Sequence, residues 1–137
     1  MRHKVTVVGG DGVGATCAQH LAEGDYADVV TSLEEVSGSH VVVVAADTDA
    51  AAIRERAPDA VLVVAKEPVA ATCRALCDAT LFPRERIIGV ADAAAAIDAV
   101  EAVLFDRRRV VPCLAMRDRE FTEVHARLGC CGIEEFA

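Results

Sequence analysis

The chain contains no tryptophan and has very little aromatic character. Its 137 residues include one tyrosine and four phenylalanines, yet 53% of the residues are hydrophobic. A core built from this composition depends on aliphatic side chains, chiefly those of alanine and valine. The length is that of one modest domain.

The sequence also lacks a basic excess and any long apolar segment. It has 14 basic and 22 acidic residues, for a net charge of −8, which argues against nucleic acid or an anionic membrane as a partner. The longest apolar run, 41–46, is far shorter than the roughly 18 residues that a membrane helix needs. No apolar run of about 7–15 residues follows the basic start of the sequence, so we expect no signal peptide and a cytoplasmic location.

The six cysteines contain no C-x-x-C motif. Without a secretory signal, reduced thiols are expected. Cys17, Cys73 and Cys77 fall in predicted helices, and Cys130 and Cys131 are adjacent between two glycines. We interpret the cysteines chiefly as core or incidental residues and predict no metal site, with a zinc site or a redox role as alternatives.

A glycine-rich segment lies between a predicted strand, Val5–Val8, and a predicted helix, Ala15–Glu23. This order is typical of a dinucleotide-binding βα unit. The G-x-G-x-x-G pattern that begins at Gly9 requires glycine at position 11, which is Asp11. A carboxylate adds bulk and negative charge where a pyrophosphate approaches a helix N-terminus. The predicted cofactor-binding residues of this segment are Gly9, Gly10, Asp11, Gly12, Val13 and Gly14.

A second register of the loop remains open. Gly10 and Gly12 flank Asp11, so a shifted G-x-G-x-G pattern would extend over positions 10, 12 and 14. The sequence therefore predicts a nucleotide-binding scaffold whose critical position has changed.

Strands alternate with helices through residue 90. Further strands are predicted at Ala27–Val30, Val41–Ala46, Ala60–Ala65 and Ile87–Val90. Further helices are predicted at Asp47–Ala57, Pro68–Leu81 and Ala91–Asp106, the first capped by Asp47, Thr48 or Asp49. Strands Val110–Met116 and Glu120–Arg127 form a hairpin, followed by a loop at Gly129–Gly132 and a short tail. We predict a small Rossmann-like α/β domain with a mostly parallel sheet, flanking helices and a C-terminal β-hairpin.

The sequence resembles the lactate/malate dehydrogenase family, particularly bacterial malate dehydrogenases. The segments that carry the resemblance are Lys4–Gly9, Val13–Ala18, Asp25–Val30, Phe82–Gly89, Val100–Leu104, Arg109–Cys113, Leu128–Gly129 and Gly132–Glu135. The resemblance implies an NAD-binding half over residues 1–92 and a remnant of the C-terminal half over residues 93–137. It also implies a hairpin and then a helix at the end of the chain.

The resemblance implies strong shortening, because the chain has less than half the usual length of the family. The acid that holds the adenosine ribose is replaced by Leu33, with Glu34 beside it as the substitute cofactor-binding residue. The mobile substrate loop is reduced to 46–49, and the Asn-Pro turn near the nicotinamide has become Glu67-Pro68. The catalytic block with its Asp–His pair and substrate-binding Arg is missing.

No histidine replaces the missing base. His3, His20 and His40 are expected away from the carboxyl ends of the strands, and His125 lies in the terminal hairpin outside the family's motifs. We therefore predict no catalytic residue and interpret the histidines as surface or edge groups.

Three functions remain open. The first is an NAD-type nucleotide-binding module without dehydrogenase activity, and the second is a non-catalytic interaction protein. The third is a malate dehydrogenase-type oxidoreductase that needs a partner subunit to supply the missing groups. A short sheet with much aliphatic surface predicts a homo-oligomer or association with a full-length relative.

Overall fold

The computed structural model describes residues 3–9 and 12–137. Their strands are β1 (His3–Val8), β2 (Ala27–Val30), β3 (Val41–Val44), β4 (Val61–Val64), β5 (Ile87–Gly89), β6 (Arg109–Arg117), β7 (Glu120–Gly129) and β8 (Gly132–Phe136). Their α-helices are α1 (Val13–Glu23), α2 (Ala50–Arg56), α3 (Val69–Thr80) and α4 (Ala93–Leu104), and 3-10 helices η1 (Leu33–Glu35) and η2 (Arg84–Arg86) precede β3 and β5.

All eight strands belong to one sheet in the order β2-β1-β3-β4-β5-β6-β7-β8. The first five strands of this order are parallel, and β6, β7 and β8 are antiparallel. The order reverses between β1 and β3, and ligands of open α/β sheets bind at the carboxyl ends of the strands at such a switch point. The predicted α/β fold is confirmed.

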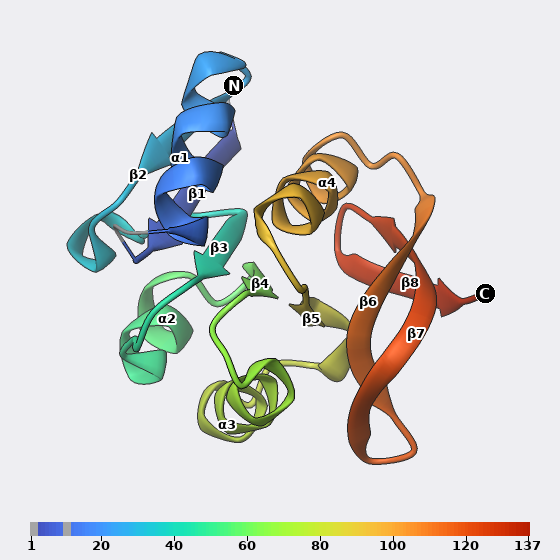
Figure 1. Cartoon of the computed structure of the whole chain (residues 1–137). Coiled ribbons are helices and arrows are strands. Elements are labelled where there is room, and N and C mark those ends of the chain that lie inside the picture. The colour runs from blue at the N-terminus through green and yellow to red at the C-terminus, as the bar shows by residue number, and fades with distance from the viewer. Residues whose placement is uncertain (1–2, 10–11) are drawn as a thin grey trace.

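Helices cover both faces of the parallel part of the sheet. Figure 1 shows α1 and α4 on one face and α2 and α3 on the other. The valines of β3 alternate accordingly, with Val41 and Val43 in the core beneath α1 and α4, and Val42 and Val44 in the core beneath α2 and α3. This double burial explains why the central strands are uninterrupted apolar runs.

The start of α2 settles which of three polar residues caps the helix. Asp49 accepts hydrogen bonds from the backbone N–H groups of Ala51 and Ala52, at 3.1 and 3.3 Å. Its carboxylate thereby satisfies amide groups that have no partner within the helix.

The end of the chain differs from the expectation of a loop and tail, and from the helix implied by the family resemblance. Gly132–Phe136 forms β8, which pairs antiparallel with β7. Burial of Ile133 and a 2.8 Å ion pair between Arg127 and Glu135 fix the strand there. The hairpin prediction is confirmed for β6 and β7, and a third antiparallel strand extends it.

Among the described residues, no helix combines the length and apolar character needed to cross a membrane.

Candidate functional site

The glycine loop lies where β1 ends and α1 begins, at the switch point of the sheet. Gly9 has φ +115° and lies against Ala45, the residue after β3, so that a Cβ at position 9 would be 3.1 Å from the Ala45 carbonyl carbon. A Cβ at Gly14 would be 2.0 Å from the Gly9 carbonyl oxygen. Both glycines are therefore required by close packing between the loop and the first turn of α1.

The N-terminus of α1 carries no side-chain cap, and its first turn holds no acidic residue. Gly12 is the N-cap residue and is exposed, with φ +56° and no atom within 4 Å of an added Cβ. Val13 is half-buried and packs against the core. Open space beside uncapped backbone N–H groups suits a bound phosphate oxygen. The predicted residues Gly10 and Asp11 lie outside the described residues.

Glu34 belongs to the segment that follows β2 on the same edge of the sheet. It lies in η1, and its backbone N–H donates a 3.2 Å hydrogen bond to Ser32 Oγ. Leu33 packs against the core, whereas Glu34 is exposed. Because β2 runs parallel to β1, this carboxylate belongs to the same carboxyl edge as the glycine loop.

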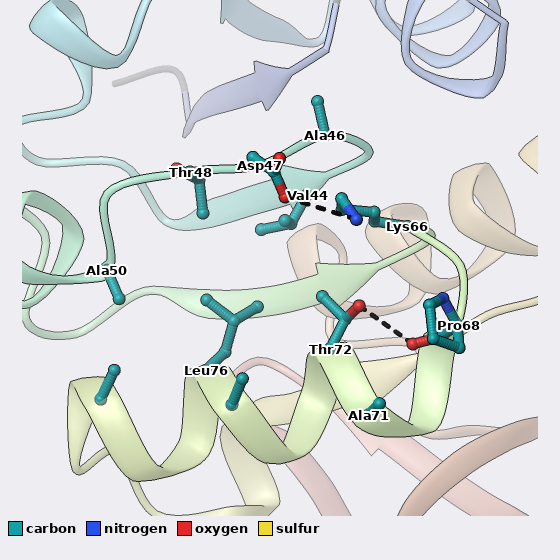
Figure 2. Close-up of a pocket in the computed structure, with 12 residues that line it drawn as sticks. Val44, Ala46, Asp47, Thr48, Ala50, Lys66, Pro68, Ala71, Thr72 and Leu76 are labelled. Atoms are coloured by element: carbon teal, nitrogen blue, oxygen red, sulfur yellow. Dashed lines mark hydrogen bonds and ion pairs between the residues drawn. The ribbon is translucent and has the colours of Figure 1, made fainter.

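A pocket of about 360 Å³ lies where β3 and β4 end, beside α3. Figure 2 shows its lining, which comes from the end of β3, the segment before α2, the segment after β4 and one face of α3. Its apolar wall includes Val44, Ala71 and Leu76. The pocket could not be expected from the sequence, since it forms between segments about 20 residues apart.

Polar side chains also line the pocket. Lys66 Nζ is 3.3 Å from Asp47 Oδ1, and Thr72 Oγ1 donates to the Pro68 carbonyl at 2.9 Å. Thr48 Oγ1 is buried and has no hydrogen-bond partner among the residues that the structure describes. A cavity with an apolar wall and a Lys66–Asp47 ion pair at its rim can hold a small molecule that has both an apolar and a polar part.

The histidines lie far from this edge in the topology. His3 opens β1 and His40 immediately precedes β3, so both lie at the amino ends of the strands, where their Nδ1 atoms are 3.0 Å apart. His20 is in the last turn of α1, 3.8 Å from Glu101, and His125 is exposed on β7. All four histidines of the chain are described, and the topology places none of them beside the glycine loop.

Three consecutive arginines, of which the third is the first residue of β6, are held by carboxylates. Arg107 is 3.6 Å from Glu101, and Arg109 is 2.8 Å from Asp98. Arg108 is 3.7 Å from both Asp106 and Glu134. These ion pairs support a structural role for the cluster.

The thiols divide by burial. Burial raises the pKa of Cys17 and Cys113 to about 11, and that of Cys73 to about 12. Cys130 and Cys131 are exposed, and all six thiols are free. Among the described residues, no three His, Cys, Asp or Glu side chains are grouped to hold a metal ion.

Comparison with known proteins identifies the fold. No family model matches the sequence, and no curated protein matches it significantly. Solved structures match well. Malate dehydrogenase from Aeropyrum pernix has a TM-score of 0.81 at 18% identity, over 97% of this chain and 89% of that chain. Malate dehydrogenase from Picrophilus torridus has a TM-score of 0.83 at 17% identity, and lactate dehydrogenase from Cryptosporidium parvum one of 0.91 at 14% identity; each alignment spans 100% of this chain and 90% of the other. This protein therefore has a Rossmann-like fold similar to that of the malate and lactate dehydrogenases.

Proposed function

We propose that this protein is a shortened malate/lactate dehydrogenase-like module that binds an NAD-type dinucleotide and does not oxidise malate or lactate by itself. Residues 1–92 form the nucleotide-binding part, and residues 93–137 are the remnant of a C-terminal half. The observation that carries the proposal is the glycine loop at the switch point, where Gly9 and Gly14 pack as a dinucleotide fingerprint requires.

The described residues fit the pyrophosphate and ribose of such a ligand. The uncapped N-terminus of α1 with Gly12 and Val13 would hold the phosphates, and exposed Glu34 would accept hydrogen bonds from ribose hydroxyls. The pocket near Lys66, where β3 and β4 end, would take the rest of the ligand. When bound, NAD supplies hydride-transfer capacity.

The positions of the possible bases support the proposed lack of dehydrogenase activity. Oxidation of a 2-hydroxy acid requires a base within hydrogen-bond reach of the hydroxyl. His3 and His40 lie at the amino ends of the strands, opposite the end where the glycine loop begins. In the turn after β4, the chain has Glu67 where the resemblance expects a neutral amide.

Thermal unfolding with and without millimolar NADH, NAD and ADP tests the binding. A ligand at 100 times its Kd adds about 2.7 kcal/mol, which raises the midpoint of a domain of this size by several degrees. We expect such a shift in the unaltered protein and a larger one in Asp11→Gly, because the substitution removes a negative charge from the sequence of the glycine loop. Asp59→Gly makes the same change in an exposed loop and should match the unaltered protein.

Two outcomes would contradict the binding proposal. A shift that occurs only in Asp11→Gly means that binding was lost at this residue, which favours the interaction protein. If neither protein shows a shift, neither binds these nucleotides, and the chain is a structural module. Oxidation of NADH by the pure protein with oxaloacetate, followed at 340 nm, would contradict the lack of activity and favour the dehydrogenase-type oxidoreductase.

Exposed apolar side chains support the second function, a module that assembles with a second copy or a full-length relative. Leu81 is 67% exposed and Phe105 is 43% exposed. We place this assembly in the cytoplasm, where its free thiols remain reduced. Light scattering at micromolar concentration should report at least a dimer, and a monomer would contradict self-association.

A further inference from the structure

The turn between β7 and β8 presents two thiols side by side. Cys130 and Cys131 are both exposed, and their Sγ atoms are 3.4 Å apart. This distance is far longer than a disulfide bond of about 2.05 Å, so the pair consists of two free thiols in hydrogen-bond contact.

Contacts on several sides hold the turn against the sheet. The Cys130 N–H donates to Asp106 Oδ1 at 3.0 Å, and the Cys130 carbonyl accepts from His40 Nε2 at 2.9 Å. Gly132 has φ +103°, and a Cβ there would be 2.1 Å from the Glu85 carbonyl oxygen. The turn is therefore docked in one position, which pre-organises the two thiols for a shared ligand.

A contact between His40 and His3 helps to hold the imidazole ring that binds the turn. A carbonyl oxygen can only accept, so His40 Nε2 carries a proton. With neutral rings, His40 Nδ1 then accepts from His3 Nδ1–H across their 3.0 Å contact. Burial and the neighbouring His40 lower the pKa of His3, which favours this neutral arrangement.

The sulfur separation is closer to the span of a near-right-angled centre than to that of a tetrahedral or linear one. At a bond length of about 2.3 Å, sulfurs 3.4 Å apart subtend an angle of about 95°. A tetrahedral ion with the same bond length needs about 3.8 Å, and a linear one about 4.6 Å. A near-right angle is typical of a trivalent pnictogen, which bonds through p orbitals and keeps a lone pair.

We propose that Cys130 and Cys131 form a binding site for trivalent arsenic, taken up as arsenous acid or as a monosubstituted arsenical. Two As–S bonds form and two As–O bonds break. Each thiol proton leaves with a hydroxyl group as water. Arsenic stays trivalent, so no oxidant or reductant takes part.

The surroundings favour this condensation over thiolate chemistry. The hydrogen bond with Cys131, then burial, Cys131 itself and the carboxylates of Asp106 and Glu134 raise the pKa of the Cys130 thiol. Disulfide exchange proceeds through the thiolate and is slowed when the thiol stays protonated. Condensation with neutral arsenous acid starts from the protonated thiols and releases their protons as water, so it is compatible with a raised pKa.

Titration of the reduced, desalted protein with phenylarsine oxide tests the site. Intact mass should show one phenylarsenic group bound with loss of one water, retained when excess glutathione is added. Cys130→Ser and Cys131→Ser should each weaken retention at least ~100-fold, because the second As–S bond is no longer intramolecular. Cys77→Ser is the control variant. Cys77 lies on α3, one helical turn from the fully buried Cys73, so its substitution should leave the retention of the phenylarsenic group unchanged.

The same titration with arsenous acid shows whether the site binds the inorganic form of trivalent arsenic as well as the organic one. Retention of both compounds, or of the organic one alone, supports the site and defines its substrate. Equal retention by Cys130→Ser would overturn the proposal. Displacement of arsenic by equimolar Cd²⁺ or Zn²⁺ would also overturn it, because the sulfur separation would then not select a pyramidal centre.

Discussion

The Tyr26 hydroxyl donates a 2.7 Å hydrogen bond to Glu101 Oε2, which joins the start of β2 to α4 across 75 residues of sequence. The Tyr26 ring also meets Phe105 edge to face, with centroids 5.0 Å apart. Glu101 is 3.6 Å from Arg107 and 3.8 Å from His20. This cluster connects α1 and the segment before β2 with α4 and the residues that follow it.

Removal of this hydroxyl should destabilise the fold. Tyr26→Phe should lower the free energy of unfolding by about 1–2 kcal/mol, because a part-buried hydrogen bond to a charged group is lost. Urea unfolding measures the change. In the double variant with Glu101→Gln, the second substitution should cost less than it does alone. Strictly additive costs would show that the two side chains are not coupled.

The same tyrosine should make stability depend on alkaline pH. Burial, followed by the hydrogen bond to Glu101, raises the pKa of Tyr26 above its usual value of 10.0. Above that pH the unfolded chain loses the proton while the folded protein retains it, so stability falls as pH rises. The fall should be smaller in Tyr26→Phe, which keeps the same buried thiols. Parallel stability curves for the two proteins from pH 9 to 11 would contradict this expectation.

Close packing at the glycine loop predicts a strong effect of Gly14→Ala. The new Cβ would lie 2.0 Å from the Gly9 carbonyl oxygen, so loop and helix must separate. We expect a loss of about 2–3 kcal/mol, at the upper end of overpacking costs. Gly38→Ala is the matched control, because its φ of +75° costs about 1 kcal/mol but its surroundings are open. Equal thermal midpoints for the two variants would contradict the packing argument.

The cap of α2 provides a local prediction. Asp49→Ala should cost about 1 kcal/mol, because Ala51 and Ala52 each lose the partner of a backbone N–H. Asp47→Ala removes a carboxylate whose side chain is 99% exposed and should stay within about 0.5 kcal/mol. Chemical denaturation measures the free energy of unfolding of both variants. A larger loss in Asp47→Ala than in Asp49→Ala would show that Asp49 is not the residue that caps α2.

Part of the candidate site could be predicted from neighbouring residues alone. The order of strand, glycine loop and helix could be predicted, because it depends on residues that are close in sequence within one βα unit. The pocket near Lys66 could not be predicted, since its walls come from segments that the sheet order brings together.

The sequence by itself determined the alternation of strands and helices, the buried β3 and the position of the glycine loop. These features follow from side-chain periodicity and backbone freedom, which act over a few residues. Only the tertiary structure decided that Gly132–Phe136 is a strand, because its pairing with β7 and the burial of Ile133 outweigh local preference. It also brought His40 within 2.9 Å of the Cys130 carbonyl, 90 residues away, a contact that depends on how the antiparallel strands fold back over the amino edge of the sheet.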